Sequence, residues 1–159
     1  MEIERKFLIK KLPEHINSYP CDMIRQAYIC TDPVIRIRQK NDQYILTVKS
    51  SGLLARKEVE FPFKAGSFMD LMKKADGNII EKKRYRIPEK DGLTIELDIF
   101  QGVFEGFIMA EVEFPDLDRA AAYTAPPWFG KEVTKDSRFH NSALSRLDSR
   151  GICEFLDLI

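Results

Sequence analysis

The most restrictive feature of the sequence is the alternation of charged and apolar residues along most of the first two thirds of the chain. Successive side chains of a β-strand point to opposite faces of a sheet, so each strand can be read as two separate faces. One face is mainly apolar, as at Ile35 and Ile37, and the other is almost entirely charged. The charged face consists of Glu2, Glu4, Lys6, Arg36, Arg38, Lys49, Glu58, Glu60, Lys82, Arg84, Glu96, Asp98, Glu111 and Glu113.

This alternation predicts eight strands, because the alternating segments are punctuated by Pro, Gly, Asn and Asp. Short turns at Asn41–Asp42, Ser51–Gly52 and Lys90–Gly92 favour antiparallel neighbours. Eight such strands can close into a barrel, which removes the unpaired edges of an open sheet. The strands are predicted over residues 2–9, 22–30, 34–40, 43–50, 56–63, 79–87, 93–100 and 107–114.

Few helices are predicted, and they are expected to cover the sheet from outside. Apolar spacing favours helices over residues 66–76 and 117–123. A third helix is predicted over residues 141–149, with Asn141 as its cap and Gly151 as its stop. The remaining C-terminal residues are apolar enough to dock, either over one mouth of the barrel or on its outer surface. The predicted fold class is therefore mainly β (α+β): an eight-stranded antiparallel closed β-barrel with a few external helices.

Composition limits the possible functions. The 159 residues suit a single domain over residues 1–159. Lysine plus arginine number 25, as do aspartate plus glutamate, so no overall field recruits nucleic acid or an anionic membrane. No apolar run approaches the length of a membrane span, and the N-terminal residues lack the apolar core of a signal peptide. Three widely spaced cysteines suit reduced thiols. These features predict a cytoplasmic protein.

The charged face has two interpretations. An antiparallel sheet with one solvated face produces the same alternation without any special chemistry. However, this face holds little Ser, Thr or Gln, and its repeated pairs have the same sign, which destabilises a strand face unless something compensates them. A polyanion held by Arg and Lys, together with divalent cations held by carboxylates, compensates both clusters. That combination is typical of phosphoryl transfer, in which the protein positions phosphates and neutralises charge.

If the charged side chains face inward, the barrel is a tunnel and the apolar face must point outward. An outward apolar face needs a cover, and few helices are predicted to supply one. We therefore expect a homodimer that buries part of the remaining apolar surface.

The segment Glu2-Ile3-Glu4-Arg5-Lys6 resembles the ExExK signature of the CYTH superfamily, the triphosphate tunnel metalloenzymes. The segment Trp128 to Thr134, leading to Arg138 and Asn141, resembles the bacterial short-chain inorganic triphosphatases in particular. The resemblance spans residues 2–147, because further motifs follow in the family's order: Ile35-Arg36-Ile37-Arg38, Leu46-Thr47-Val48-Lys49, Glu58-Val59-Glu60, Glu81-Lys82-Lys83-Arg84-Tyr85, Glu96-Leu97-Asp98 and Glu111-Val112-Glu113.

The resemblance implies metal-dependent hydrolysis of inorganic triphosphate to pyrophosphate and phosphate, with Mg²⁺ or Mn²⁺ as cofactor. It also implies that Lys49, paired with Lys6, activates water in contact with the substrate. The implied metal site comprises Glu2, Glu4, Glu111 and Glu113, with Asp98 and Glu60 as nearby supports. The implied phosphate contacts come from Lys6, Arg36, Arg38, Lys82 and Arg84, with Arg138 adding a further contact from the C-terminal segment.

Other functions remain open at this point. On the same fold, a thiamine triphosphatase or a class IV adenylyl cyclase shares the phosphate contacts but also needs a pocket for a ring, and no dedicated aromatic platform is evident in the sequence. A non-catalytic polyphosphate-binding module needs the basic residues but not the carboxylate cluster. The expected ligand in each case is a small-molecule phosphate compound, not nucleic acid or membrane.

Overall fold

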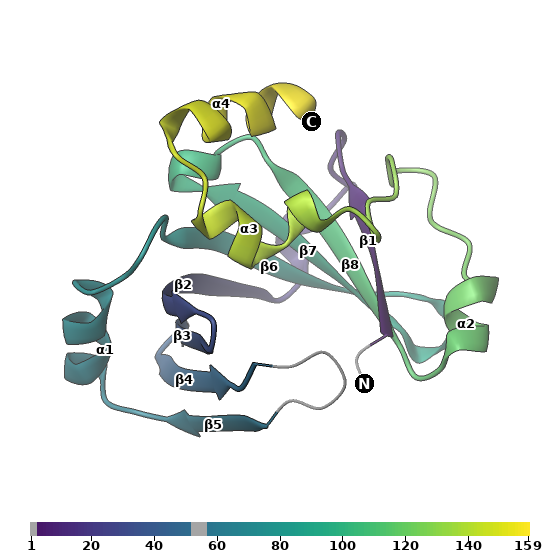
Figure 1. The fold of residues 1–159 in the computed structure, drawn as a ribbon. Helices are drawn as coiled ribbons and strands as arrows, with labels where there is room; N and C mark the ends of the chain where they lie inside the picture. The colour runs from purple at the N-terminus through teal and green to yellow at the C-terminus, as the bar shows by residue number, and fades with distance from the viewer. Residues whose placement is uncertain (1–2, 52–56) are drawn as a thin grey trace.

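The eight predicted strands form one antiparallel sheet (Figure 1). The computed structural model describes residues 3–51 and 57–159, and each strand lies within two residues of its predicted position. The strand order is β1-β8-β7-β6-β2-β3-β4-β5. The strands are β1 (Ile3–Leu8), β2 (Cys21–Thr31), β3 (Val34–Lys40), β4 (Gln43–Lys49), β5 (Glu58–Pro62), β6 (Ile80–Pro88), β7 (Thr94–Gln101) and β8 (Ile108–Phe114).

Two predicted turns have the expected backbone. Asn41, between β3 and β4, has a φ of 52°, and Asp91, between β6 and β7, has a φ of 58°. Asn and Asp tolerate this left-handed region better than most residues, because their short side chains bond locally to the backbone. Part of the turn predicted at Ser51–Gly52 lies outside the described residues.

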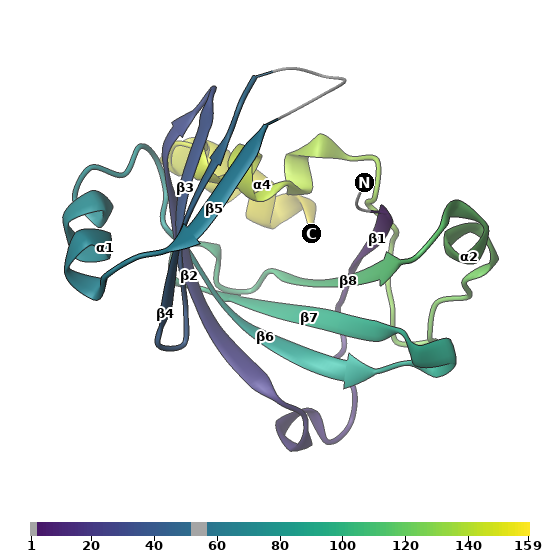
Figure 2. The ribbon, with the colours of Figure 1, turned by 90° about the horizontal axis from the view of Figure 1, so that it is seen from below.

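The sheet curves into a C in Figure 2, but hydrogen bonds between strands do not close it in the described part of the chain. β1 and β5 are the two ends of the strand order, so the predicted closed barrel is not confirmed. The outer edge of β1 pairs instead with residues 130–134. The N–H groups of Gly130 and Val133 donate to the carbonyls of Leu8 and Lys6 at 2.7 and 2.8 Å. Residues 130–134 thus occupy the backbone N–H and C=O groups of β1 with which β5 would have to pair to close the barrel.

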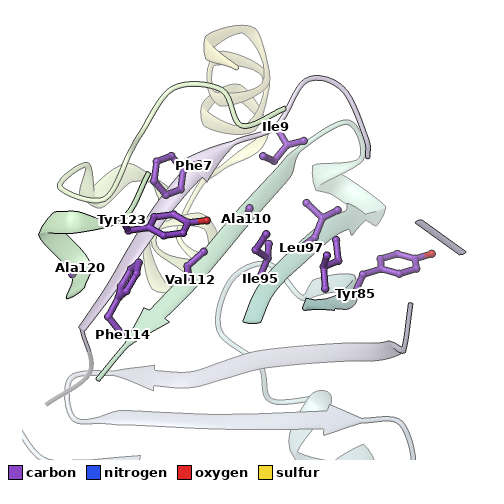
Figure 3. Packing of buried hydrophobic residues seen from close by; sticks show 11 residues of the cluster. Phe7, Ile9, Tyr85, Ile95, Leu97, Ala110, Val112, Phe114, Ala120 and Tyr123 are labelled. Carbon is purple, nitrogen blue, oxygen red and sulfur yellow. The ribbon is translucent and has the colours of Figure 1, made fainter. Parts of the chain in front are cut away.

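The apolar side chains point to the convex face, as predicted, and helices cover much of it. Helix α1 (Ala65–Met72) buries Phe68 and Met72 against Ala27 and Ile37 of β2 and β3. Near the β1 end of the strand order, α2 (Leu117–Ala122) and Tyr123 pack against β1, β7 and β8. Figure 3 shows Tyr123 between Phe7 and Phe114 in this cluster.

The C-terminal helices close one end of the concave, charged face. Leu8, Ile80, Phe100 and Met109 share this face with the charged residues two positions away on each strand. They form a buried cluster with Phe139, with Leu144 of α3 (Asn141–Ser145) and with Phe155 of α4 (Ser149–Leu158). Of the two docking positions considered for the C-terminal segment, the structure therefore shows the one over the end of the concave face.

The predicted boundaries of the C-terminal helix were wrong. The chain forms two helices, α3 and α4, because the Asp148 side chain accepts a hydrogen bond from the Gly151 N–H at 2.7 Å and starts the second one. Gly151 therefore lies inside α4 and does not stop a helix. Asn141 is the first residue of α3, whose N-cap is His140. No helix in the described ranges is both long and apolar enough to span a membrane.

The loop before β6 anchors this C-terminal segment. The Asn78 amide donates to the carbonyls of Leu144 and Leu147 at 2.9 and 2.7 Å, and its N–H donates to Ser145 at 2.7 Å. Gly77 precedes it with a φ of +86°, and a Cβ there would lie 2.0 Å from the Ser145 carbonyl oxygen. Only glycine allows the two backbones to approach this closely.

We predict that Gly77→Ala destabilises the protein by about 2–4 kcal/mol, because it combines backbone strain with a collision against backbone. The matched control is Gly92→Ala. Gly92 has a φ of +73° but nothing within 4 Å of the added Cβ, so only the strain of roughly 1–2 kcal/mol remains. Urea unfolding measures both variants, and equal losses would mean that the contact between Gly77 and the C-terminal segment is absent.

Candidate functional site

The concave face contains a cavity of about 360 Å³. The described residues that line it are six glutamates, five basic residues and one asparagine, and each strand residue among them belongs to the charged list read from the sequence. The lining residues are Glu4, Lys6, Arg36, Arg38, Lys49, Glu58, Glu60, Arg84, Glu96, Glu111, Glu113 and Asn141. The charged side chains converge on one cavity, and a simple solvated face does not explain this arrangement.

Nine of the predicted site residues line this cavity: Glu4, Lys6, Arg36, Arg38, Lys49, Glu60, Arg84, Glu111 and Glu113. Lys82 and Asp98 do not, since both are fully buried beneath it. Arg138 is largely exposed and bonds to Asp136, outside the lining. Glu2 lies outside the described residues.

One wall of the cavity is acidic, because neighbouring strands place glutamates opposite one another. In the register of β1 with β8, Glu4 faces Glu113 and Lys6 faces Glu111. Lys6 bridges two of these carboxylates, with Nζ 3.0 Å from Glu4 and 3.6 Å from Glu111. Burial opposes the charge of Lys6, but the carboxylates outweigh burial and raise its pKa. Lys6 is therefore held as an ammonium.

Glu111 is a carboxyl group on this wall whose surroundings disfavour its negative charge. Burial raises the pKa of Glu111, and the nearby carboxylates of Asp98 and Glu4 add to the shift, despite the opposing charges of Lys6 and Lys82. A carboxylate in this state gains from a further cation.

The opposite wall is basic and carries Arg36 and Arg38 of β3 and Lys49 of β4. Burial, together with repulsion from Arg36 and Arg84, lowers the pKa of Arg38 to about 10. Repulsion among arginines of this kind is relieved by an anion, and guanidinium groups bind phosphate oxygens in pairs. The two walls together can therefore hold a polyanion on one side and cations on the other.

Arg84, which lines the cavity, forms an ionic group with Lys82 and Asp98, which are both fully buried. The Nζ of Lys82 lies 2.7 Å from Asp98, and Arg84 donates two hydrogen bonds to the same carboxylate at 2.7 and 2.8 Å. Burial alone would raise the pKa of Asp98, but the two cations outweigh it, and the pKa lies below its usual range. Asp98 therefore orients Arg84 from below.

The sequence interpretation missed three lining residues. Glu96 and Glu58 were on the charged face but received no role, although strand period alone places them beside Asp98 and Glu60. Asn141 was interpreted as a helix cap. Its side chain instead lines the cavity from α3, and its Oδ1 is buried with no hydrogen-bond partner in the described part of the chain.

The acidic wall fits a divalent cation in its chemistry, since Mg²⁺ and Mn²⁺ prefer carboxylate oxygens. Residues 3–51 and 57–159 contain no three His, Cys, Asp or Glu side chains already gathered as a metal cage. Lys6 sits between Glu4 and Glu111 instead. The raised pKa of Glu111 is the observation that favours a cation here, with Glu4, Glu111 and Glu113 as the available ligands.

Comparisons with known proteins agree with this geometry. The family described as CYTH domain matches residues 1–147. An inorganic triphosphatase of Nitrosomonas europaea is 40% identical over 148 residues, which cover 91% of this chain and 96% of that protein. One from Acetivibrio thermocellus is 36% identical and covers 90% and 92%. The crystal structure of an inorganic triphosphatase gives a TM-score of 0.78 at 37% identity, covering 93% of this chain and 96% of that one.

The buried ionic group gives a testable prediction. Asp98→Asn should cost about 3–5 kcal/mol of stability, because it leaves the Lys82 ammonium buried without its anion. Lys82→Met should cost less, since Arg84 still satisfies Asp98. The lowered pKa of Asp98 means that its contribution is present above pH ~4 and is lost as the pH falls through the folded-state value.

Urea unfolding between pH 3 and 7 measures these effects. The stability of Asp98→Asn should depend less steeply on pH at the acid end than that of the parent protein. The exposed pair Arg138 with Asp136 supplies the control, because Asp136→Asn should change little. Equal losses for Asp98→Asn and Asp136→Asn would contradict a structural role for Asp98.

Proposed function

The chain belongs to the CYTH domain family, and on that premise we propose that it hydrolyses inorganic triphosphate to pyrophosphate and phosphate with a divalent metal ion. The observation that carries this proposal is the cavity with a carboxylate wall facing an arginine wall whose charges repel one another. The proposal also agrees with the activity named for the two relatives at 36–40% identity.

The size and lining of the cavity favour a free phosphate chain over a larger substrate. Its volume of about 360 Å³ is near the lower end of the roughly 300–1,000 Å³ typical of small-molecule sites. Among the described lining residues there is no aromatic side chain on which a base or thiamine ring could stack. A thiamine triphosphatase or an adenylyl cyclase therefore has less support from this site than a triphosphatase.

In the proposed reaction, Arg36, Arg38 and Arg84 hold the phosphate oxygens, with the Lys6 ammonium contributing from the acidic wall. Glu4, Glu111 and Glu113 would hold the metal. A bound Mg²⁺ or Mn²⁺ supplies charge neutralisation at the phosphate oxygens. Water attacks a terminal phosphorus, and the bond to the bridging oxygen breaks to release phosphate and pyrophosphate.

The two lysines predicted to be catalytic receive different roles. Lys6 is held protonated by Glu4 and Glu111, so it suits a phosphate contact and not a base. Lys49 lines the opposite wall, with Nζ 3.9 Å from Glu58. We propose that the Lys49 amine accepts the proton of the attacking water.

Five further residues from the sequence prediction take indirect roles or stay untested. Asp98 bonds to Arg84 and pairs with Lys82, so it supports Arg84 and is itself neutralised by Lys82. Glu60 accepts a hydrogen bond from Thr47 and lies 3.9 Å from Arg36, so it supports the basic wall and is not a metal ligand in this proposal. Glu2 stays a prediction as a metal ligand, and Arg138 has no contact that favours a phosphate role.

Single-domain organisation over residues 1–159, a homodimer and a cytoplasmic location also stay predictions. The apolar side chains Val59 and Phe61 on β5 are exposed, and they are the part of the convex face that a second copy would cover.

The proposed activity is tested by phosphate release from tripolyphosphate with Mg²⁺, with Mn²⁺ and with a chelator. We expect turnover that depends on the metal and is lost on chelation. The same protein should make little cyclic AMP from ATP. Tight binding of tripolyphosphate without turnover under any metal would instead indicate a binding module, and dominant cyclic AMP formation would indicate a cyclase.

The role of Lys49 is tested by Lys49→Met, which removes the amine but keeps much of the side-chain volume. We expect turnover to fall by at least about a hundredfold, the usual contribution of a general base. Tripolyphosphate binding should remain measurable by calorimetry. Lys57→Met, at an exposed position outside the cavity lining, is the control and should leave both quantities unchanged. Full activity of Lys49→Met would remove this residue from the mechanism.

A further inference from the structure

The three arginines in the cavity differ in how their charges are compensated. Arg84 bonds to Asp98 and also pairs with Glu96. Arg36 lies 3.9 Å from the Glu60 carboxylate. Arg38 forms no ion pair with any of residues 3–51 and 57–159, although it is largely buried.

Arg38 is held by a neutral side chain. Its Nε donates to the Gln26 Oε1 at 2.9 Å, and the two residues are cross-strand partners in the β2–β3 register. Gln26 is fully buried on the concave face. Because a guanidinium can only donate hydrogen bonds, the amide must present its oxygen to Arg38.

This contact uses only one half of the amide. The Gln26 Nε2 is buried and has no hydrogen-bond partner among the residues that the structure describes. An unpaired buried donor is unfavourable, and glutamate at this position would avoid it while offering Arg38 a full counter-charge. The stability of the folded protein therefore does not explain why this position holds glutamine and not glutamate.

Resting on the proposed function, we propose that Gln26 is a positioning residue that fixes Arg38 toward the phosphate chain while leaving the charge of Arg38 free for the substrate. The single contact engages Nε, so the two terminal nitrogens of the guanidinium stay available for a bidentate contact with phosphate oxygens. A carboxylate in place of this amide would compete with the substrate for the same guanidinium.

The test is Gln26→Glu, measured by calorimetry with metal-free tripolyphosphate and by steady-state hydrolysis. We expect the Kd and the KM to rise by about tenfold or more, since the new carboxylate neutralises Arg38. The value of kcat should change much less. The melting temperature of the unliganded variant should equal or exceed that of the parent, because the carboxylate pairs with an already buried cation.

The matched control is Gln43→Glu, which adds the same charge at an exposed position in the β3–β4 hairpin. It should leave binding and turnover unchanged. If Gln26→Glu lowers stability and kcat without raising the Kd, the role of Gln26 is merely structural and the inference is wrong. The same conclusion follows if Gln26→Glu binds tripolyphosphate as tightly as the parent.

A double-mutant cycle tests whether Gln26 acts through Arg38. Gln26→Met and Arg38→Met should each weaken tripolyphosphate binding, but adding Gln26→Met to Arg38→Met should change the Kd by less than about twofold. Additive losses would contradict action through Arg38. If the parent binds tripolyphosphate but does not hydrolyse it, the proposed function fails while the binding measurements still decide the role of Gln26.

Discussion

The rest of the structure depends on one constraint, the repulsion between like charges on the concave face of the sheet. Burial, together with repulsion from Arg36 and Arg84, lowers the pKa of Arg38 to about 10, and burial with nearby carboxylates raises the pKa of Glu111. Along the strand order, the lining residues of β1, β7 and β8 are acidic apart from Lys6, and those of β3 and β4 are basic, with two further glutamates on the adjoining β5. Curvature of the sheet then turns these walls toward each other, so that one ligand with its cations can satisfy both (Figure 2).

The same constraint determines where the apolar side chains go. Since the concave face is charged, the core must form on the convex face, where α1 and α2 supply the covering layer. At one end of the concave face the charged rows give way to Phe100 and Met109, and the C-terminal helices close that end with Leu144 and Phe155. The C-terminal segment also pairs with the edge of β1 and contributes Asn141 to the cavity lining, and the outer edge of β5 stays without a partner strand within the described residues.

The strands and the residues on their charged faces could be predicted because both depend on a period of two along the chain. Burial along a strand could not: Lys82 was predicted as a phosphate contact and Asp98 as a support of the metal site, and the pattern did not indicate that both would be fully buried outside the cavity lining. The alternation of charged and apolar residues also does not predict contacts outside the sheet. The alternation does not indicate that Arg138 pairs with Asp136, that Asp148 starts a helix by accepting a hydrogen bond from Gly151, or that residues 130–134 occupy the edge of β1. Gln26 was not predicted as a site residue because it is uncharged, and its proposed role depends on its contact with Arg38.

We propose that a phosphate chain and its cation lie between the two walls of the concave face. A crystal structure with Mn²⁺ and a non-hydrolysable triphosphate analogue tests it directly, because the anomalous signal of manganese locates the metal independently of the phosphates. We expect phosphate oxygens against Arg36 and Arg38, and manganese against the carboxylates of Glu111 and its neighbours on β1 and β8. Analogue bound on the outer surface, or manganese distant from these carboxylates, would contradict the account.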